Sequence, residues 1–383
     1  MIEYITAGES HGPMLVGIIK NLPAGLAIDK TFIDGELARR MLGFGRGGRM
    51  KIERDAAEFV TGVRGGKTLG SPLTAIIYNR DHENWKDVMG FAATDDGMAS
   101  RRVTAVRPGH ADLSGSVKYG FNDARNVLER ASARESAMRV CLGAVAKLYL
   151  RELGIEIYSH TVSIGGVTAE QTADFKSINE RADGNPVRCL DEKASVLMQE
   201  AISAAGEKGD TVGGVTEIVI IGCKSGIGSY VSSDRKLDGI IMSEVGSVQS
   251  VKAVEIGDGI VNASLLGSSV HDELFTKNKK LHRKTNRAGG LEGGMSNGEP
   301  IVIRAYCKPI PTLKCGLNTV DIESGKAVKA TPERSDVCAV PAAGVVCEAA
   351  AALALTKALS DMLGGDTMDE VKARYELKRS FNG

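Results

Sequence analysis

The sequence has no excess of charge of either sign and no paired cysteine motif. Lys plus Arg and Asp plus Glu both total 48 of the 383 residues, so the formal net charge is zero. Proteins that bind nucleic acid or an anionic membrane surface normally carry a basic excess, so we expect neither partner. The seven cysteines are odd in number and form no Cys-x-x-Cys pair. We therefore expect reduced thiols, without a disulfide framework or a bound metal.

The sequence also lacks an evident leader or membrane span. Residues 1–5 contain no basic region followed by an apolar stretch, so no signal peptide is predicted. The most apolar long stretch, residues 345–363, carries Glu348, Lys357 and Asp361. A bilayer span needs about 20 largely uncharged residues, so we interpret this stretch as a buried helix. We expect a soluble, cytoplasmic protein.

The glycine-rich turns of the common nucleotide-binding folds are missing. Glycine is abundant, at 46 residues, yet no strand and helix are joined by Gly-x-Gly-x-x-Gly. The pattern Gly-x-x-x-x-Gly-Lys-Ser/Thr is also absent, which argues against a Rossmann domain and a P-loop. Hydrophobic periodicity predicts a helix over residues 31–42, with Thr31 as its N-cap, and strands over 73–78, 216–221 and 301–306. Strands and helices in mixed order favour an α+β fold.

Two longer helices are predicted over residues 132–153 and 342–363. Both are rich in alanine and glycine, and such small residues let helix backbones approach closely, so we expect both helices to lie centrally. Each follows a related tetrad, Glu-Arg-Ala-Ser at 129–132 and Glu-Arg-Ser-Asp at 333–336. The repeat of tetrad and helix indicates an internal duplication.

Two histidines stand in glycine-containing turns. His11 lies in Thr-Ala-Gly-Glu-Ser-His-Gly-Pro, residues 6–13, and histidine titrates near about pH 6.5, which suits proton transfer. His110 follows Pro-Gly, with Arg107 and Asp112 close by, so this segment could bind an anion and move a proton. For both, the alternative is a structural turn. The remaining histidines, 82, 160, 271 and 282, are interpreted as surface or core residues.

Basic residues and glycines gather in residues 39–51. Five basic residues and four glycines occur within thirteen positions. Arginine forks match carboxylate and phosphate oxygens, and glycines let backbone amides join them. This pattern favours a site for a small polyanion. A solvated charged loop is the plainer alternative, and a disordered Arg-Gly RNA-binding box is disfavoured because the motif occurs only once in a neutral chain.

Three further segments carry polar groups that could bind an anion or could be structural. Arg130 and Arg134 are four residues apart, on one face of a helix near its N-terminus, where anions are favoured. Ion pairing with Glu129 and Glu135 is the alternative there. The other two segments, 308–312 and 334–336, both read as loops, and an aspartate such as Asp336 before a helix is more often a structural N-cap than a catalytic group.

Taken together, these segments resemble the chorismate synthase family in order along the whole chain. The matching segments are 8–12 (Gly-Glu-Ser-His-Gly), the Gly-Arg loop through Arg49, 107–112 (Arg-Pro-Gly-His-Ala-Asp), 130–135 (Arg-Ala-Ser-Ala-Arg-Glu), 209–214 (Gly-Asp-Thr-Val-Gly-Gly), 288–294 (Ala-Gly-Gly-Leu-Glu-Gly-Gly) and 333–336 (Glu-Arg-Ser-Asp). One such motif could be chance, but seven in order are highly specific.

The resemblance implies a lyase that converts 5-enolpyruvylshikimate-3-phosphate to chorismate and phosphate, the final step of the shikimate pathway, which feeds aromatic amino acid biosynthesis. The reaction is a 1,4-anti elimination that needs reduced FMN, which lends an electron transiently and recovers it with the hydrogen. The substrate carries a phosphate and two carboxylates. The residues that match its binding positions are Ser10, Arg40, Arg46, Arg49, Arg107, Arg134 and Arg334.

The resemblance also implies roles for individual residues. His11 would protonate the leaving phosphate, His110 would donate to the N1 region of reduced flavin, and Asp336 would accept a proton relayed through flavin N5. Ala131 stands where serine is common in the family, which removes one hydrogen bond. The residues that match flavin contacts are Arg130, Ala131, Ser132, Gln249, Ser250, Gly293, Lys308, Pro309, Ile310, Pro311, Thr312 and Arg334.

The implied architecture is one domain over residues 1–383, a four-layer β-α-α-β sandwich with an internal duplication. Antiparallel sheets lie outside and the long small-residue helices lie in the centre, and the assembly is a homotetramer. Arg40 and Arg46 match positions for NADPH, which some members use to reduce FMN. The compact chain favours instead the type that depends on an external flavin reductase. A rival enzyme class, an enolpyruvyl transferase, would share the arginines without needing flavin.

Overall fold

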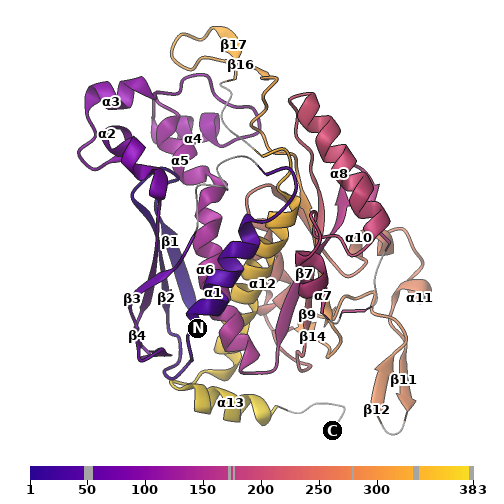
Figure 1. Ribbon diagram of the computed structural model, residues 1–383. Helices are drawn as coiled ribbons and strands as arrows, with labels where there is room; N and C mark the ends of the chain where they lie inside the picture. Colours follow the sequence, from indigo (N-terminus) through magenta and orange to yellow (C-terminus); the bar gives the residue numbers. More distant parts are fainter. Residues whose placement is uncertain (47–54, 171–173, 176, 278–279, 331–335, 379–383) are drawn as a thin grey trace.

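Two antiparallel sheets enclose a set of helices in the computed structural model, which describes residues 1–46, 55–170, 174–175, 177–277, 280–330 and 336–378 (Figure 1). The first sheet has the strand order β1-β2-β6-β3. Alternate residues of β6, Leu73, Ala75 and Ile77, are fully buried, as expected for a sheet with one face on the core. The strands of this sheet are β1 (Glu3–Ala7), β2 (Met14–Lys20), β3 (Glu58–Thr61) and β6 (Leu73–Tyr78).

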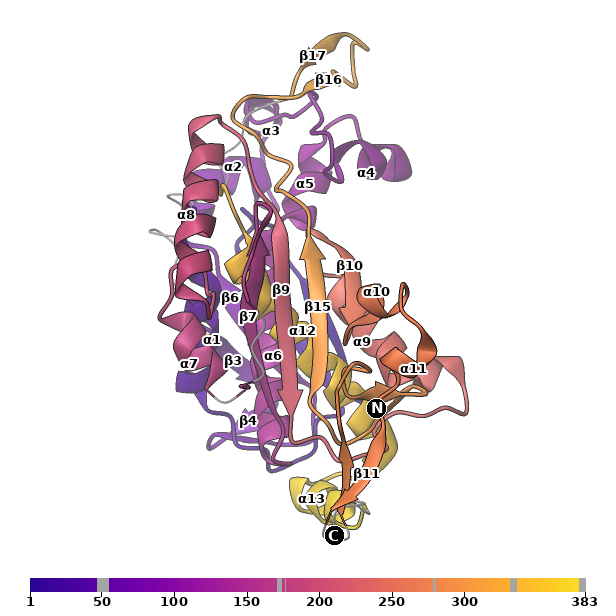
Figure 2. The same ribbon diagram turned by 90° about the vertical axis from the view of Figure 1, so that its right-hand side faces the viewer.

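The second sheet repeats the strand order of the first. Its strand order is β10-β15-β9-β7-β8 (Figure 2). Without the edge strand β8, and read from β7 to β10, the strands follow the chain order first, second, fourth, third, as they do in the first sheet from β1 to β3. Each final strand, β6 or β15, is followed along the chain by a long central helix. The strands of this sheet are β7 (Glu156–Ile164), β8 (Val167–Thr168), β9 (Gly214–Ile221), β10 (Val251–Ile256) and β15 (Ile301–Cys307).

The helices between the sheets form the centre of the core. Helix α6 (Ser136–Arg151) packs on β2 and β6, α12 (Val340–Leu363) packs on β7 and β9, and α6 and α12 pack against each other. Gly143 marks their closest approach, because a Cβ built there would lie 2.3 Å from Ala349 Cβ. The expected central position of the two small-residue helices is thereby confirmed. Two shorter helices, α1 (Lys30–Met41) and α9 (Leu237–Gly246), complete this layer.

The helix boundaries differ from the sequence prediction at their N-termini. Asp29, and not Thr31, caps α1, since its carboxylate accepts a hydrogen bond from Phe32 N. The helix predicted from residue 132 does not begin there. Helix α5 (Arg125–Ala131) ends just before Ser132, whose backbone is extended and whose hydroxyl accepts a hydrogen bond from Arg134 N. A short 3₁₀ turn then leads into α6. Asp336 does not cap α12, whose first turn follows Ala339.

An ionic network lies buried among α1, α6 and α12. The fully buried carboxylate of Glu348 accepts from Arg39 Nη1 and Nη2, at 3.0 and 2.9 Å, and is paired with Lys147. Lys147 Nζ lies 2.6 Å from Glu36, which Arg39 also contacts. Burial alone would raise the pKa of Glu348, but Arg39 and Lys147 outweigh it and hold that pKa well below its ordinary value. Arg188 also reaches Glu348 from beyond β7.

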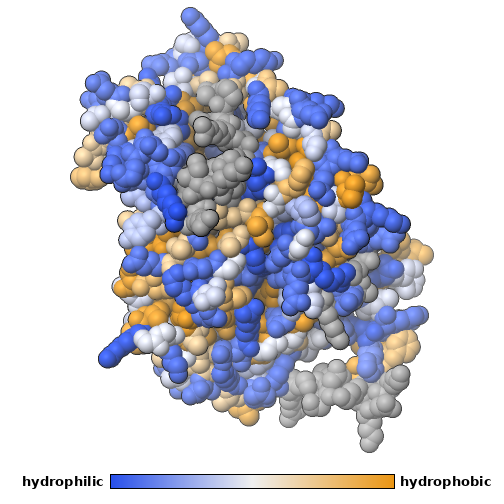
Figure 3. Space-filling model, in the orientation of Figure 1, coloured by the Kyte–Doolittle hydropathy of each residue, from blue (hydrophilic) through white to orange (hydrophobic). Residues whose placement is uncertain are grey.

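Helix α12 is long and apolar enough to cross a bilayer, but 94% of its apolar window is buried inside the protein. The face in Figure 3 is mainly hydrophilic with scattered apolar residues. The other elements are β4 (Val63–Arg64), β5 (Lys67–Thr68), η2 (Arg80–Trp85), α2 (Lys86–Met89), α3 (Asp95–Ser100), α4 (Asp112–Tyr119), α7 (Ile178–Asp183), α8 (Glu192–Glu207), α10 (Gly259–Asn262), α11 (Gly267–Val270), β11 (Leu274–Lys277), β12 (Lys280–Arg283), β13 (Leu291–Glu292), β14 (Met295–Ser296), β16 (Asn318–Val320), β17 (Ala327–Lys329) and α13 (Met368–Glu376).

The α6–α12 contact predicts opposite effects of one substitution at two glycines. Gly143→Ala should lower the free energy of unfolding by about 1–3 kcal/mol, because the added methyl must displace the backbone of Ala349. Gly35→Ala, on the exposed side of α1 where no atom lies within 4 Å, should raise it by about 0.5–1 kcal/mol. Urea unfolding measures both. A Gly143→Ala protein as stable as the parent would refute the close packing of these helices.

Candidate active site

The loop between β1 and β2 carries the first predicted site residues. Gly8 has φ +106°, and a Cβ there would lie 2.3 Å from Met14 O, so the turn requires glycine. Ser10 N donates to Glu129 O at 3.0 Å. Asn79, just beyond β6, donates from its side chain to Glu9 O and to Gly12 O at 3.0 and 2.8 Å. The loop is therefore fixed from both sides.

Glu129 on α5 orients His11. Its carboxylate lies 2.8 Å from His11 Nδ1 and accepts from His11 N at 3.0 Å. Burial would raise the pKa of Glu129, but its bonds to His11 and Arg125 hold that pKa below its ordinary value. The ionised carboxylate thus accepts from Nδ1–H, and His11 Nε2 makes no hydrogen bond within the part of the chain that the structure describes. Nε2 is left to serve a ligand.

Two aromatic rings complete the surroundings of His11. Trp85 stacks on the imidazole with ring centroids 4.0 Å apart. His82 Nδ1 lies 2.9 Å from His11 O. The sequence interpretation of His82 as an ordinary surface or core residue missed this position beside the site.

Arg40 and Arg134 meet at the buried carboxylate of Asp55. Arg134 Nη1 lies 2.7 Å from Asp55 Oδ1, and its Nε donates to Asn79 Oδ1 at 2.9 Å. Arg40 Nη1 lies 3.6 Å from Asp55, while its Nε donates to Ser136 Oγ at 3.0 Å. Burial, with the nearby charges of Arg46 and Arg134, lowers the pKa of Arg40 to about 10 despite Asp55. A site that destabilises its own cations in this way favours an anionic ligand.

Asp336 and Arg46 join two segments that are far apart in the sequence. Arg46 Nη1 lies 2.8 Å from Asp336 Oδ2. Beside them, Val337 N donates to Gly45 O at 2.8 Å, which joins the loop after α1 to the segment before α12. The predicted substrate residues Arg49 and Arg334 lie outside the described residues.

His110 has a carboxylate partner of the same kind as His11. Asp112, fully buried at the start of α4, is hydrogen-bonded to His110 Nδ1 and accepts from Arg107 Nε at 2.8 Å. Burial would raise the pKa of Asp112, but its bonds with His110 and Arg107 outweigh burial and hold that pKa well below its ordinary value. Arg107 Nη1 also donates to Thr312 Oγ1 at 3.1 Å, and Lys308 Nζ donates to Gly109 O at 3.0 Å. Segments 107–112 and 308–312 are therefore joined.

Several predicted flavin contacts lie around the N-terminal end of α6. Arg130 Nη2 donates to Thr6 O at 2.9 Å, and Ser132 Oγ lies 3.4 Å from Ser10 Oγ. Gln249 Nε2 donates to Glu135 Oε2 at 3.0 Å. Ser250 has a positive φ of 77°, which is uncommon for a residue other than glycine and often marks a functional site. Of the other predicted contacts, Ala131 ends α5, Ile310 O accepts from Thr211, and Pro311 lies beside Gly109.

Gly293 is the predicted contact that the structure does not bring to this cluster. It lies in the turn between β13 and β14, where Gly294 O accepts from Leu237 N at 2.8 Å at the start of α9. Gln249 follows the other end of α9. A helix of ten residues spans about 15 Å, so Gly293 and Gln249 are separated by roughly that length.

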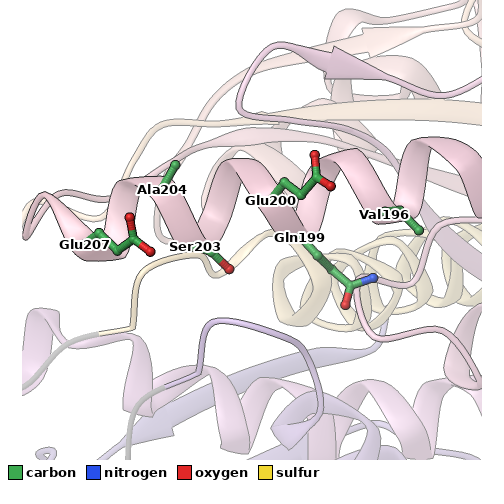
Figure 4. Close-up of a pocket in the computed structure, with 6 residues that line it drawn as sticks. All are labelled: Val196, Gln199, Glu200, Ser203, Ala204 and Glu207. Carbon is green, nitrogen blue, oxygen red and sulfur yellow. The ribbon is translucent and has the colours of Figure 1, made fainter.

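A surface hollow elsewhere offers no competing site. It has a volume of about 420 Å³ and is formed entirely by one side of α8 (Figure 4). Its lining contains carboxylates but no cation, histidine or cysteine. The residues that line it are Val196, Gln199, Glu200, Ser203, Ala204 and Glu207.

The Asp112 contacts predict a pH-dependent contribution to stability. Because the pKa of Asp112 is lower in the folded than in the unfolded protein, its contribution is complete above the unfolded pKa of about 3.9 and is lost as the pH falls. Asp112→Asn should lower the free energy of unfolding by about 2 kcal/mol at pH 7. In urea titrations the deficit should stay constant from pH 7 to about pH 4 and shrink only below that pH, where the unfolded carboxyl takes up its proton. A deficit that grows on acidification would contradict the assigned ion pairs.

Comparisons with known proteins agree with the geometry. A family model for chorismate synthase matches residues 2–360. The chain is 50% identical over 385 residues to the chorismate synthase of Geobacillus sp. (strain WCH70), covering 99% of each sequence. It is 49% identical over 377 residues to that of Carboxydothermus hydrogenoformans, covering 98% of each.

A solved structure gives the same result for the fold. The crystal structure of a chorismate synthase matches with a TM-score of 0.78 at 38% sequence identity, covering 98% of this chain and 96% of that chain. That structure shares the mixed helix and strand content and the antiparallel sheets of this chain. This agrees with the α+β prediction. The chain belongs to the chorismate synthase family, enzymes of the lyase step of the shikimate pathway that forms chorismate.

Proposed function

We propose that the chain converts 5-enolpyruvylshikimate-3-phosphate to chorismate and phosphate by a 1,4-anti elimination that requires reduced FMN. The observation that carries this proposal is the placement of His11 beside buried arginines. Ser10 and Ser132 bring the His11 loop against the start of α6, and Ser132 Oγ accepts from Arg134 N at 3.2 Å. An acid and anion-binding groups thus share one site, as protonation of a leaving phosphate requires.

The arginines account for the anionic groups of the substrate. Arg40, Arg46 and Arg134 converge near Asp55 and Asp336, so a phosphate or carboxylate entering there would relieve their mutual repulsion. Ser10 supplies a hydroxyl beside them. The proposed substrate residues also include Arg107, Arg49 and Arg334.

The residues around Gln249 fit a flavin. Gln249 Oε1 is buried and has no hydrogen-bond partner within the described residues, so this oxygen is available to accept a hydrogen bond from a ligand N–H. The isoalloxazine ring presents an imide N–H of that kind. The residues proposed to hold it are Arg130, Ala131, Ser132, Gln249, Ser250, Lys308, Pro309, Ile310, Pro311, Thr312 and Arg334, whereas Gly293, the remaining predicted contact, lies apart from Gln249 within one chain.

Reduced FMN, when bound, supplies an electron transiently for the departure of phosphate and leaves no net redox change. The chain's own residues handle protons. His11 delivers a proton from Nε2 to the leaving phosphate, while Glu129 stabilises the ring through Nδ1. His110 is held through Nδ1 by Asp112, so its Nε2 would be available to donate a hydrogen bond to the bound cofactor. Asp336, paired with Arg46, is the proton acceptor.

The finer architectural expectations belong to the same proposal. The succession of the first sheet, α6 with α1, α12 with α9, and the second sheet supports a four-layer sandwich. The shared strand order supports an internal duplication within one domain over residues 1–383. We further propose a cytoplasmic homotetramer. Reduction of FMN by an external reductase is proposed over self-reduction with NADPH at Arg40 and Arg46.

An anaerobic assay tests the reaction. The protein is mixed with 5-enolpyruvylshikimate-3-phosphate and chemically pre-reduced FMN, and chorismate and phosphate are followed together. Equal release of both products is expected. A second assay replaces reduced FMN with oxidised FMN and NADPH, where an external reductase should be needed for turnover. Binding of the substrate without either product would overturn the flavin mechanism and leave only an anion site.

The role of His11 predicts a loss of turnover without a matching loss of substrate binding. His11→Gln should reduce kcat by about 10²–10⁴-fold, the usual value of a general acid, while KM changes little because the arginines remain. Steady-state kinetics under anaerobic conditions measure both parameters. His271→Gln, a change of the same type at the residue that follows the remote helix α11, should leave both unchanged. Equal kcat for His11→Gln and the parent protein would remove His11 from the mechanism.

A further inference from the structure

The chain's single tryptophan lies face to face with His11. The ring centroids of Trp85 and His11 are 4.0 Å apart and the ring planes differ by 20°. Trp85 is 9% exposed at the end of η2, and its indole Nε1 donates to Asp81 Oδ2 at 3.2 Å. Because Asp81 belongs to the same turn, the plane of the indole is fixed independently of His11.

Two groups contact the imidazole of His11 and fix its orientation. The carboxylate of Glu129 lies at the Nδ1 edge of the imidazole, and the π face of Trp85 covers one side of it. An aromatic face attracts a cation, so the stacking contact is stronger when the imidazole carries a proton. The stacked indole also restricts rotation of the imidazole ring, which keeps Nε2 in one direction.

Other charged groups around the two rings balance one another in part. Arg101 and Arg125 place their guanidinium carbons 4.9 and 5.2 Å from the centre of the indole ring, and Arg125 also donates to Glu129 at 3.1 Å. Asp81 opposes them with one negative charge. His82 contacts the backbone oxygen of His11 and not its ring. Among the residues that the structure describes, the direct partners of the imidazole ring itself are Glu129 and Trp85.

We propose that Trp85 is a positioning residue that holds the plane of the His11 imidazole by stacking, so that Nε2 is presented to the substrate in a fixed direction. The proposal rests on the role of His11 as the general acid. It assigns to a tryptophan outside the predicted motifs the task of keeping the acid oriented before phosphate leaves. Glu129 fixes one edge of the ring and Trp85 fixes its plane, so neither residue replaces the other.

The sole tryptophan allows a direct spectroscopic test that needs no substrate. An imidazolium in contact with an excited indole quenches its emission by accepting an electron, whereas a neutral imidazole does so poorly. Emission excited beyond the tyrosine band should therefore fall as the pH is lowered through the titration of His11. His11→Gln should abolish this step, and the control variants His82→Gln and His271→Gln should retain it. A step that persists in His11→Gln would overturn the proposal.

Kinetics test whether the contact matters for catalysis. Trp85→Phe keeps an aromatic face and should keep kcat within about threefold, whereas Trp85→Leu should lose about tenfold in kcat with little change in KM. Recovery of kcat in Trp85→Phe but not in Trp85→Leu separates a stacking role from a general loss of folding. A wild-type kcat for Trp85→Leu would overturn the positioning role.

The emission titration and the kinetic assays distinguish a failure of this inference from a failure of the proposed reaction. If the parent protein makes no chorismate, the reaction proposal fails, but the emission titration still decides whether Trp85 and the charged form of His11 are in contact. If Trp85→Leu is too unstable to assay, Trp85→Phe and the emission of the His11→Gln protein remain decisive. A Trp85→Phe variant that loses as much kcat as His11→Gln would contradict a role that requires only an aromatic face.

Discussion

The buried ionic network at Glu348 is the constraint on which the site geometry depends. It joins α1, α6 and α12 through Arg39, Lys147 and Glu348 in the middle of the molecule. Arg39 and Arg40 are consecutive on α1, so their side chains diverge by about 100° around the helix. Arg39 enters the network and Arg40 enters the arginine cluster at Asp55. Because a buried charge without its partner is strongly destabilising, α1 has one acceptable rotation, and that rotation places Arg40.

A buried or nearly buried carboxylate accompanies each of the principal polar groups of the site. Glu129 pairs with His11, Asp112 pairs with His110, Asp55 pairs with Arg134, and Glu135 accepts a hydrogen bond from Gln249. These pairs fix orientation before a ligand arrives, which removes the need to reorganise during the reaction. They also show how a chain of zero net charge can gather arginines and histidines in one region, because buried carboxylates balance part of their charge.

The local sequence pattern predicted the helices and strands well, but it predicted the side-chain contacts between them poorly. Strands such as β6 follow from a period of two, and the central helices follow from runs of small residues that only a helix crossing explains. The interruption at Ser132 was missed because one hydroxyl bond to Arg134 N decides it. The pairing of Asp55 with Arg134 and of Glu348 with Arg39 gave no signal, since these partners lie 79 and 309 residues apart and only the fold brings them together.

The site histidines were predicted from glycine-containing turns, but the residues that hold them were not all predicted. Trp85 carried no motif, and its stacking on His11 depends on the tertiary placement of η2. Gly293 illustrates the opposite case. Its motif matches the family, yet α9 separates it from Gln249 within this chain, and sequence order alone contains no information on that distance.

The position of α12 in the chain has a consequence for biosynthesis. Both sheets and α6 leave the ribosome before this helix, although α12 supplies the surface against which α6, β7 and β9 pack. During translation these elements carry uncovered apolar faces, and the ionic network lacks the carboxylate of Glu348. The core therefore cannot be completed before α12 emerges, and until then its uncovered apolar surface favours aggregation.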